Sequence, residues 1–258
     1  MLEPEVIHEL ATKLDMALVQ KHEVPRLTQD VAELSIADAY SVMMVGIGLR
    51  QARGEHIVGW KMGLTSLAKR EQMNLDRAIW GVLTDAMQVR DGGELRVADG
   101  VHPKIEPEIA LRLGHALSGR VTREEAWEAV DGVCAALEVL DSRYVGFKYF
   151  SLPDVIADNA SSFRFVLGRW QPPCDVADLP MAMEVNDQVV QAGSSAAISG
   201  HPVESLVQLM ELLSEHGMTL PADSVILTGA ATLAEPLHAG MTVRLRVPGL
   251  ADVSVRAV

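Results

Sequence analysis

Cysteine and cationic side chains are scarce in this 258-residue sequence, and each scarcity argues against a class of protein. The two cysteines, Cys134 and Cys174, lie far apart and have no metal-ligand spacing. A chain of this length does not need a disulfide to hold a core, so we expect a reduced, cytoplasmic protein. Lysine and arginine number 22 against 35 aspartate and glutamate, a formal net charge of −13. This charge repels phosphate backbones and argues against nucleic acid or an anionic membrane as the main partner.

Long apolar runs and internal repeats are also missing. No uninterrupted apolar stretch reaches the length of a membrane span, and the first residues are acidic and polar where a secretory signal would be basic and then apolar. We therefore expect no membrane segment. Because strands and helices do not alternate regularly and no segment repeats, we expect neither a doubly wound sheet nor a solenoid.

The sequence does contain enough apolar residues, 48%, to bury a sizeable core. Apolar residues recur at helical spacing over 6–18, and Ser35-Ile36-Ala37-Asp38 has the form of a capping box before a second helix that ends near Gly54. We assign residues 1–75 to a helical N-terminal segment and residues 76–258 to a β-rich catalytic domain.

Short β-like runs separated by turns follow Gly54 and predict a mixed, β-rich α+β fold. Asn186-Asp187 is expected to form a tight hairpin, and a capping box at 122–125 is expected to open a helix that runs through Val130. The predicted strands include 56–62, 80–89, 135–140, 163–167, 182–185, 188–191 and 224–228, with a closing hairpin of 241–247 and 251–258.

Two glutamates, Glu106 and Glu108, alternate with apolar residues over 105–109. Residues two apart on a strand point to the same face, so both carboxylates would project together and repel each other. A hard divalent cation such as Mg²⁺ would relieve that repulsion, because it prefers carboxylate oxygens. The alternative is a solvated strand face.

A third glutamate, Glu138, stands alone in the apolar run Ala-Ala-Leu-Glu-Val-Leu. Burying a lone carboxylate is costly unless it is paired or bound to a cation, which makes Glu138 a functional candidate. The alternative is an edge-strand glutamate that points to water.

Lys61 lies in an apolar strand between Gly59 and Gly63, which would let another group approach the backbone closely. Its ammonium either reaches solvent at a sheet edge or meets an anion in a site. Residues 64–66 resemble a helix N-terminus, which is either a plain cap or a place for a carboxylate. The polar run 158–162 would suit a ligand-binding loop, although an ordinary turn would have the same composition.

Together these segments resemble the hydratase and decarboxylase branch of the fumarylacetoacetate hydrolase superfamily, and the resemblance covers nearly the whole chain. The motifs that carry it are GWKMGLTS at 59–66, HPKIEPE at 102–108, LEVLDSR at 137–143, ADNASS at 157–162, GHP at 200–202 and ILTG at 226–229. The resemblance implies a β-rich roll preceded by a helical segment. It also implies Mg²⁺ or Mn²⁺ held by Glu106, Glu108 and Glu138.

Two activities occur in this branch: hydration of 2-oxopent-4-enoate and decarboxylation of 2-oxo-3-hexenedioate (4-oxalocrotonate), which precedes it in the meta-cleavage catabolism of aromatic compounds. The hydratases usually carry an aspartate in the segment that reads DRAIWG at 76–81 here, whereas the decarboxylases resemble this chain in having isoleucine at that point, Ile79. Addition of water needs a positioned acid or base, but loss of CO₂ needs mainly an electron sink. We therefore expect decarboxylation, with hydration as the alternative.

The resemblance also implies roles for other residues. Lys61 would bind or protonate the enolate oxygen, and Asp158 and Ser161 would orient the substrate. The expected substrate-binding residues are Leu64, Thr65, Ser66, Ile79, Lys104, Arg143, Asn159, Ser162 and Thr228, and the cations available for the distal carboxylate are Lys104, Arg143 and Arg164.

Two further alternatives follow from the same family. The chain could be a non-catalytic partner of the hydratase, but the intact set of three glutamates and Lys61 argues against that. Hydrolysis of an acylpyruvate would need a histidine base near the metal, and neither His56 nor His102 matches the family's hydrolytic base. The expected partners are a small dicarboxylic 2-oxo acid, the hydratase and further copies of the chain.

Overall fold

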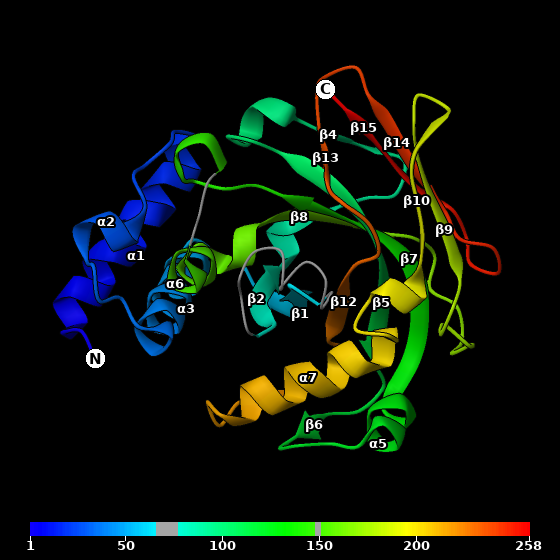
Figure 1. Ribbon diagram of the computed structural model, residues 1–258, viewed down its shortest axis with the longest axis horizontal. Helices are drawn as coiled ribbons and strands as arrows, with labels where there is room; N and C mark the ends of the chain where they lie inside the picture. Colours follow the sequence, from blue (N-terminus) through cyan, green and yellow to red (C-terminus); the bar gives the residue numbers. More distant parts are fainter. Residues whose placement is uncertain (66–76, 148–150) are drawn as a thin grey trace.

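The computed structural model describes residues 1–65, 77–147 and 151–258 (Figure 1). The helices are α1 Pro4–Gln20, α2 Leu27–Asp30, α3 Ile36–Ala52, α5 Arg123–Glu128, α6 Leu152–Ala157 and α7 Pro202–Ser214. The strands are β1 Ile57–Gly63, β2 Ile79–Thr84, β3 Gln88–Val89, β4 Gly93–Leu95, β5 Lys104–Leu113, β6 Leu117–Ser118, β7 Val130–Leu140, β8 Ser162–Leu167, β9 Pro180–Val185, β10 Gln188–Ser194, β11 Thr219–Leu220, β12 Val225–Ala230, β13 Glu235–Pro236, β14 Thr242–Arg246 and β15 Val253–Ala257.

The N-terminal helices form a layer at one side of the molecule, where α1 packs on α3 and α3 packs on α6 (Figure 1). The Ser35 side chain accepts a hydrogen bond from the backbone N–H of Asp38, as the capping pattern predicted. The last of these N-terminal helices, α3, ends at Ala52. The next element, β1, already belongs to the main sheet and pairs with β2 and β12. Among the described residues, no helix combines the length and apolar character that a bilayer span requires.

The described strands form two curled sheets and a separate pair of β6 and β11, which confirms the predicted β-rich α+β fold. In the main sheet the order is β2-β1-β12-β5-β7-β8-β3, with β13 added beside β5. The second sheet has the order β10-β9-β14-β15-β4. Asn186 and Asp187 both have positive φ, 49° and 63°, which gives the tight turn predicted between β9 and β10.

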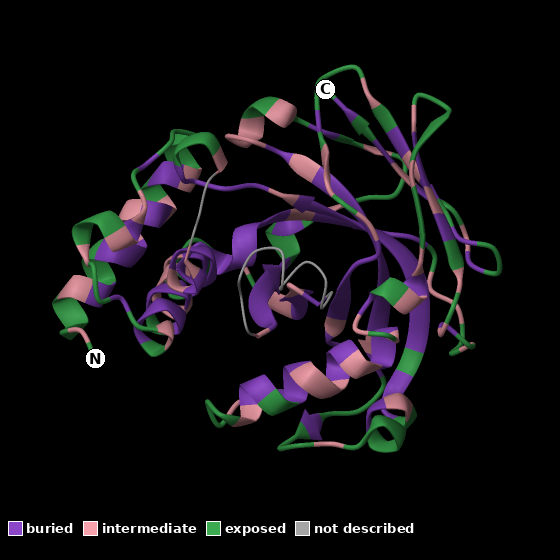
Figure 2. Cartoon of the chain, in the orientation of Figure 1, coloured by how far each residue is buried: buried purple, intermediate pink, exposed green. Residues whose placement is uncertain are grey.

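The longest strands, β5 and β7, form the middle of the main sheet. Nearly all of their residues are buried (Figure 2), so they have the continuous apolar character of strands covered on both faces. The capping box at Thr122 is present, but the helix α5 ends at Glu128. The prediction that it runs through Val130 was wrong, because Val130 begins β7 and its side chain is buried in the core.

Candidate active site

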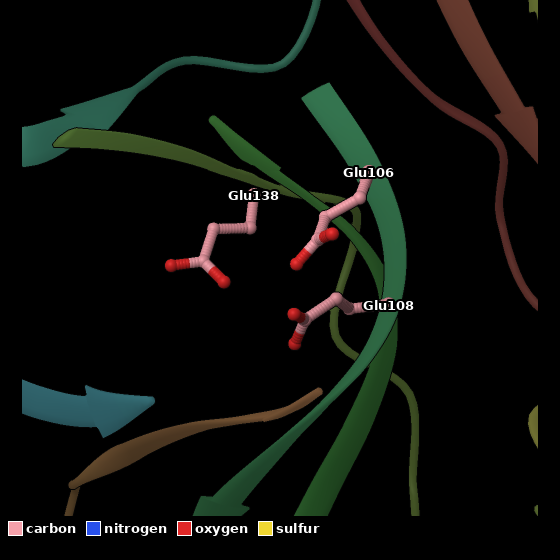
Figure 3. A group of neighbouring side chains, drawn as sticks. All are labelled: Glu106, Glu108 and Glu138. Atoms are coloured by element: carbon pink, nitrogen blue, oxygen red, sulfur yellow. The ribbon is translucent and has the colours of Figure 1, made fainter. Parts of the chain in front are cut away.

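Three glutamates from β5 and β7 converge on one point, as Figure 3 shows. Glu106 faces Glu138 directly across the β5–β7 ladder, and Glu108 lies two residues along β5 on the same face. One oxygen of each carboxylate lies within 4.8 Å of the other two. Glu108 and Glu138 are fully buried and Glu106 is 8% exposed, so a solvated strand face is excluded.

Two of these carboxylates have oxygens without a hydrogen-bond donor. Within the described part of the chain, Oε1 of Glu108 and Oε1 of Glu138 are buried and have no hydrogen-bond partner. Oε2 of Glu108 accepts a hydrogen bond from the Gly229 N–H at 2.8 Å. Buried oxygens of this kind are costly unless a cation binds them, so the three residues fit a hard divalent ion.

The electrostatics of the group reflect its burial and the closeness of its negative charges. Burial, followed by the charges of Glu138 and Glu106, raises the pKa of Glu108 well above its ordinary value. Burial also raises the pKa of Glu138. Both carboxylates therefore retain protons to higher pH than a solvated glutamate as long as no further cation is bound.

Lys61 is a cation that contacts this group. Its Nζ lies 3.2 Å from Oε2 of Glu138 and donates a hydrogen bond to the carbonyl of Ala160 at 3.1 Å. Burial by itself lowers the pKa of Lys61, but the charges of Glu138, Glu106 and Glu108 outweigh it and raise that pKa above its ordinary value. Lys61 is 2% exposed, so it does not reach solvent at a sheet edge.

The glycines on either side of Lys61 have the close approaches that the sequence predicted. A Cβ on Gly59 would lie 2.0 Å from the carbonyl oxygen of Val225 in the adjacent strand β12. A Cβ on Gly63 would lie 3.0 Å from the Ile79 side chain. At Gly59 only glycine lets β1 lie this close to β12, whereas a Cβ at Gly63 would require the Ile79 side chain to shift.

A cavity of about 140 Å³ opens beside Lys61 and Glu106. It brings together four of the predicted substrate or catalytic residues besides these two, namely Leu64, Thr65, Ile79 and Ser161. The remaining lining residues are Met62, Gly63, Leu140, Val155, Ala160 and Ala230. The cavity is therefore apolar around a small polar group, as sites for small ligands usually are.

A strained turn supplies part of this lining. Asn159, Ala160 and Ser161 have φ of 51°, 49° and 61°, three consecutive residues in the left-handed region. The Asn159 side chain holds the turn, because its Oδ1 accepts from the Val82 N–H at 2.8 Å and its Nδ2 donates to the Val82 carbonyl at 2.9 Å. This turn presents the Ala160 carbonyl to Lys61.

Arg143 and Asp158 pair with each other instead of lining this cavity. The Arg143 backbone N–H donates to the Asp158 carboxylate at 3.1 Å, and the guanidinium forms a buried ion pair with it. Burial raises the pKa of Asp158 to about 6 against the lowering effect of Arg143. Both residues line a separate small cavity beside α1 and α3.

The other predicted residues have varied positions. Lys104 lies on the same face of β5 as Glu106, and its Nζ lies 4.1 Å from the centre of the Phe147 ring. Thr228 is buried and donates to the Ile109 carbonyl at 2.8 Å, and the Ser162 hydroxyl is buried without a hydrogen-bond partner in the described chain. Ser66 lies outside the described residues.

Arg164 lies on the wrong face of the sheet to bind the distal carboxylate. It faces Val139 in the β7–β8 ladder, whereas Phe165 faces Glu138, and adjacent residues of a strand point to opposite faces. Arg164 is therefore no longer a candidate to bind the distal carboxylate of a substrate on the Glu138 face. His56 and His102 do not line the cavity; they pair with Asp85 and Glu23.

Sequence reasoning missed Gly229 and Leu140. Gly229 has a φ of 107° and donates its N–H to Glu108, and a Cβ there would lie 2.3 Å from the Thr65 hydroxyl. The signal for Gly229 was its place at the end of the strand run 226–229. Leu140 lines the cavity because it lies two residues after Glu138 on the same strand face.

Comparison with known proteins assigns this arrangement to a family. The sequence profile described as "Fumarylacetoacetate (FAA) hydrolase C-terminal" matches residues 48–258. The chain belongs to the fumarylacetoacetate hydrolase family. Within this family it is 47% identical to a 4-oxalocrotonate decarboxylase of Pseudomonas sp., over 96% of both chains. It is 32% identical to a 2-hydroxyhexa-2,4-dienoate hydratase of Comamonas testosteroni, over 99% of both.

A solved family structure has nearly the same fold. The 4-oxalocrotonate decarboxylase from Pseudomonas putida G7, complexed with magnesium and adipate, superposes with a TM-score of 0.97. It is 39% identical to this chain, and the match covers 100% of this chain and 99% of that one. The match includes the helical N-terminal layer, which lies mostly outside the profile.

Proposed function

We propose that this chain catalyses the metal-dependent decarboxylation of 2-oxo-3-hexenedioate (4-oxalocrotonate) to 2-hydroxypenta-2,4-dienoate and CO₂. The observation that carries the proposal is its greater identity to a 4-oxalocrotonate decarboxylase, 47%, than to a hydratase of comparable coverage, 32%. The related structure with adipate supports it further, because adipate is a six-carbon dicarboxylate like the proposed substrate.

Glu106, Glu108 and Glu138 would hold Mg²⁺ or Mn²⁺ through their convergent oxygens. When bound, this ion acts as a Lewis acid toward the 2-oxo carboxylate end of the substrate. The glutamates come from paired strands in the middle of the main sheet, so their separation is fixed before any ligand arrives.

Lys61 stabilises the negative charge that develops during the reaction. As the bond between C5 and C6 breaks, its electron pair moves through the conjugated chain to the oxygen on C2. A buried ammonium near that oxygen needs no reorganisation at the moment of reaction, which is why such groups contribute strongly to catalysis. The Ala160 carbonyl and Glu138 hold Lys61 in place, and its ammonium is the proton donor to the C2 oxygen.

The two carboxylates of the substrate need separate binding groups. We assign the C1 carboxylate to the Leu64–Ser66 segment, of which Leu64 and Thr65 line the cavity. We assign the distal carboxylate to Lys104, because its ammonium lies on the metal-site face of β5 and forms no ion pair in the described chain. Ser161 lines the cavity and would orient the substrate.

Arg143, Asp158 and Asn159 have their polar atoms engaged with the protein. We therefore assign them a positioning role: the Arg143–Asp158 pair and the Asn159 contacts with Val82 fix the left-handed turn at 159–161. Thr228 is likewise bound to Ile109 and positions the end of β12.

The lining around Ile79 supports decarboxylation over hydration. In the described chain the cavity lining includes no aspartate and no histidine, so beyond the proposed metal ligand Glu106 it offers no carboxylate or imidazole to activate water. Apolar side chains at Ile79, Leu140 and Val155 would exclude water from the electron-rich product.

A product assay tests the proposal. The purified protein with Mg²⁺ is incubated with 2-oxo-3-hexenedioate, and CO₂ is followed beside 2-hydroxypenta-2,4-dienoate and its hydrated form, 4-hydroxy-2-oxopentanoate. We expect stoichiometric CO₂ without the hydrated product. Hydration of added 2-hydroxypenta-2,4-dienoate at a comparable rate would establish the hydratase alternative, and no turnover of either compound would favour a non-catalytic partner.

The reaction has a natural successor, since its dienol product is the type of substrate that the related hydratases are named for. We propose that this chain forms a complex with such a hydratase and that it also self-associates. We place the complex in the cytoplasm, where the two free cysteines would stay reduced. Co-elution of the two proteins in size-exclusion chromatography, at a mass above that of either alone, would support this assembly.

A further inference from the structure

A second pocket rich in positive charge lies where α1 and α3 end, on the opposite face of the main sheet from the three glutamates. It has a volume of about 290 Å³. Its charged lining consists of Lys21, Arg50, Arg53 and Arg164 with Glu55 and Asp99, and we call it the Arg164 pocket. Four cations against two anions is an unusual balance in a chain whose net charge is −13.

Three of these cations already have carboxylate partners. Lys21 pairs with Asp99 at 2.6 Å and Arg50 with Glu55 at 3.1 Å. Arg53 is bound in a two-pronged contact by Asp15, at 2.6 and 2.7 Å. Their location also has an ordinary explanation, because cations are favoured at the carbonyl ends of helices such as α1 and α3.

Arg164 differs from these three cations. It belongs to the strand β8, and it forms no ion pair with a carboxylate in the described chain. Its Nη1 donates to the carbonyl of Phe163 at 2.9 Å, and the guanidinium carbon lies 4.2 Å from the Phe163 ring centre. A guanidinium has five N–H donors, and the described residues accept from one of its nitrogens.

The surrounding charges do not compensate Arg164. Burial lowers its pKa below the ordinary arginine value, and the more distant carboxylates of Asp99, Glu55 and Asp141 only partly oppose that effect. Burial also lowers the pKa of Arg50, and the positive charge of Arg164 contributes to that lowering. Two partly buried arginines thus lie in one pocket, and of the two only Arg50 has a carboxylate partner in the described chain.

We infer that the Arg164 pocket binds a small dianion of the carboxylate or phosphate class, with the planar guanidinium of Arg164 as the principal contact. A guanidinium fork matches two acceptor oxygens of such an anion, and a charge-assisted pair of hydrogen bonds is among the strongest in proteins. The volume fits a molecule of a few carbon atoms, and the charge of the chain excludes a polyanion such as nucleic acid. The pocket adjoins β8, which pairs with β7, and Phe165 on the opposite face of β8 from Arg164 faces Glu138.

Isothermal titration of the Mg²⁺-loaded protein tests this site, with sodium sulfate and sodium succinate as separate probes at constant ionic strength. The variants are Arg164→Met, which keeps the apolar stem, and Arg120→Met, which removes an exposed arginine elsewhere. We expect Arg164→Met to raise the Kd for at least one probe about tenfold or more, and Arg120→Met to leave it unchanged. Succinate that binds at the catalytic cavity should bind there equally in both variants. Only the difference in affinity between Arg164→Met and Arg120→Met therefore reports on the Arg164 pocket.

The pattern of probes distinguishes the ligand classes: sulfate alone indicates a phosphate-like ligand, and succinate alone a carboxylate. The inference is overturned if the wild-type chain binds neither probe, or if Arg164→Met binds both as tightly as the wild type. If circular dichroism shows that Arg164→Met misfolds, Arg164→Lys decides the matter. It keeps the charge but loses the fork, so a weakened affinity supports the contact and an unchanged affinity overturns it.

Discussion

Glu106 and Glu138 face each other across the β5–β7 ladder, 32 positions apart in the sequence by their numbering (138 − 106). Like charges at facing positions of a sheet destabilise it, and both of these residues are buried. The arrangement is stable only with compensating positive charge, of which Lys61 supplies one unit. The metal therefore has a structural reason to bind here as well as a catalytic one.

Replacing Glu138 by glutamine removes one negative charge and keeps the shape of the side chain. We expect Mg²⁺ affinity and turnover to fall together by about 100-fold or more, since even changes to residues behind a metal ligand cost about 10- to 100-fold. In EDTA the variant should be as stable as the wild type or more stable, because a buried charge is gone. Mg²⁺ titration and thermal denaturation measure both effects.

Glu184→Gln is the matched control for that experiment. Glu184 is also a buried glutamate, but it lies on β9 in the second sheet and pairs with Arg246 at 3.3 Å. Its Mg²⁺ affinity should equal that of the wild type. Full wild-type activity in EDTA would refute the metal assignment outright.

Mg²⁺ binding should strengthen as pH rises. The pKa of Glu108 is raised above 4.5 in the folded, metal-free chain, so its stabilising contribution is complete below that value and is lost as pH rises through the raised pKa. Mg²⁺ needs the ionised carboxylate and must displace the proton. The gain in Tm on adding Mg²⁺ should therefore be larger at about pH 8 than at about pH 5, with proton release detectable by calorimetry in two buffers. Equal gains at both pH values would contradict this.

Lys61→Met keeps the apolar stem of the lysine and deletes its charge. Turnover should fall by about 10²- to 10³-fold, the loss seen when one group that stabilises a developing oxyanion is removed. With saturating Mg²⁺ the Tm should change little, since the metal compensates the glutamates in place of the ammonium. Lys13→Met, at a partly exposed lysine of α1 outside the cavity lining, serves as control. A variant that works normally would show that Lys61 is structural.

Local patterns in the sequence predicted more of this site than of its surroundings. Alternation over 105–109 placed Glu106 and Glu108 on one face, and the cost of burial singled out Glu138. Each of these inferences uses only the residue pattern within a single strand. The β5–β7 register, which brings the three together, depends on packing between distant segments and could not be read from either strand alone.

The sequence could not tell which polar residues of 158–162 face a ligand. Asp158 forms an ion pair with Arg143, and the Asn159 side chain hydrogen-bonds to the backbone of Val82. Both contacts accompany the left-handed turn at 159–161. Nothing in the composition of that run distinguishes such a turn from an ordinary loop. Arg164 was placed on the wrong face for a related reason, since only the register of β8 against β7 shows that it faces Val139 and not Glu138.

Lys104→Met tests how the chain selects a dicarboxylate. Lys104 lies on the same strand face as Glu106, and its Nζ contacts the Phe147 ring, a contact worth only about 0.5–1 kcal/mol where solvent is near. The variant should therefore fold normally. If its ammonium binds the distal carboxylate, KM for 2-oxo-3-hexenedioate should rise about 10- to 100-fold, the equivalent of one charge-assisted hydrogen bond. Inhibition by a 2-oxo monocarboxylate should not change, because that molecule lacks the second charge, and Lys13→Met should match the wild type in both assays. If Lys104→Met weakens the binding of mono- and dicarboxylates equally, Lys104 has a structural role in the site and another group binds the distal carboxylate.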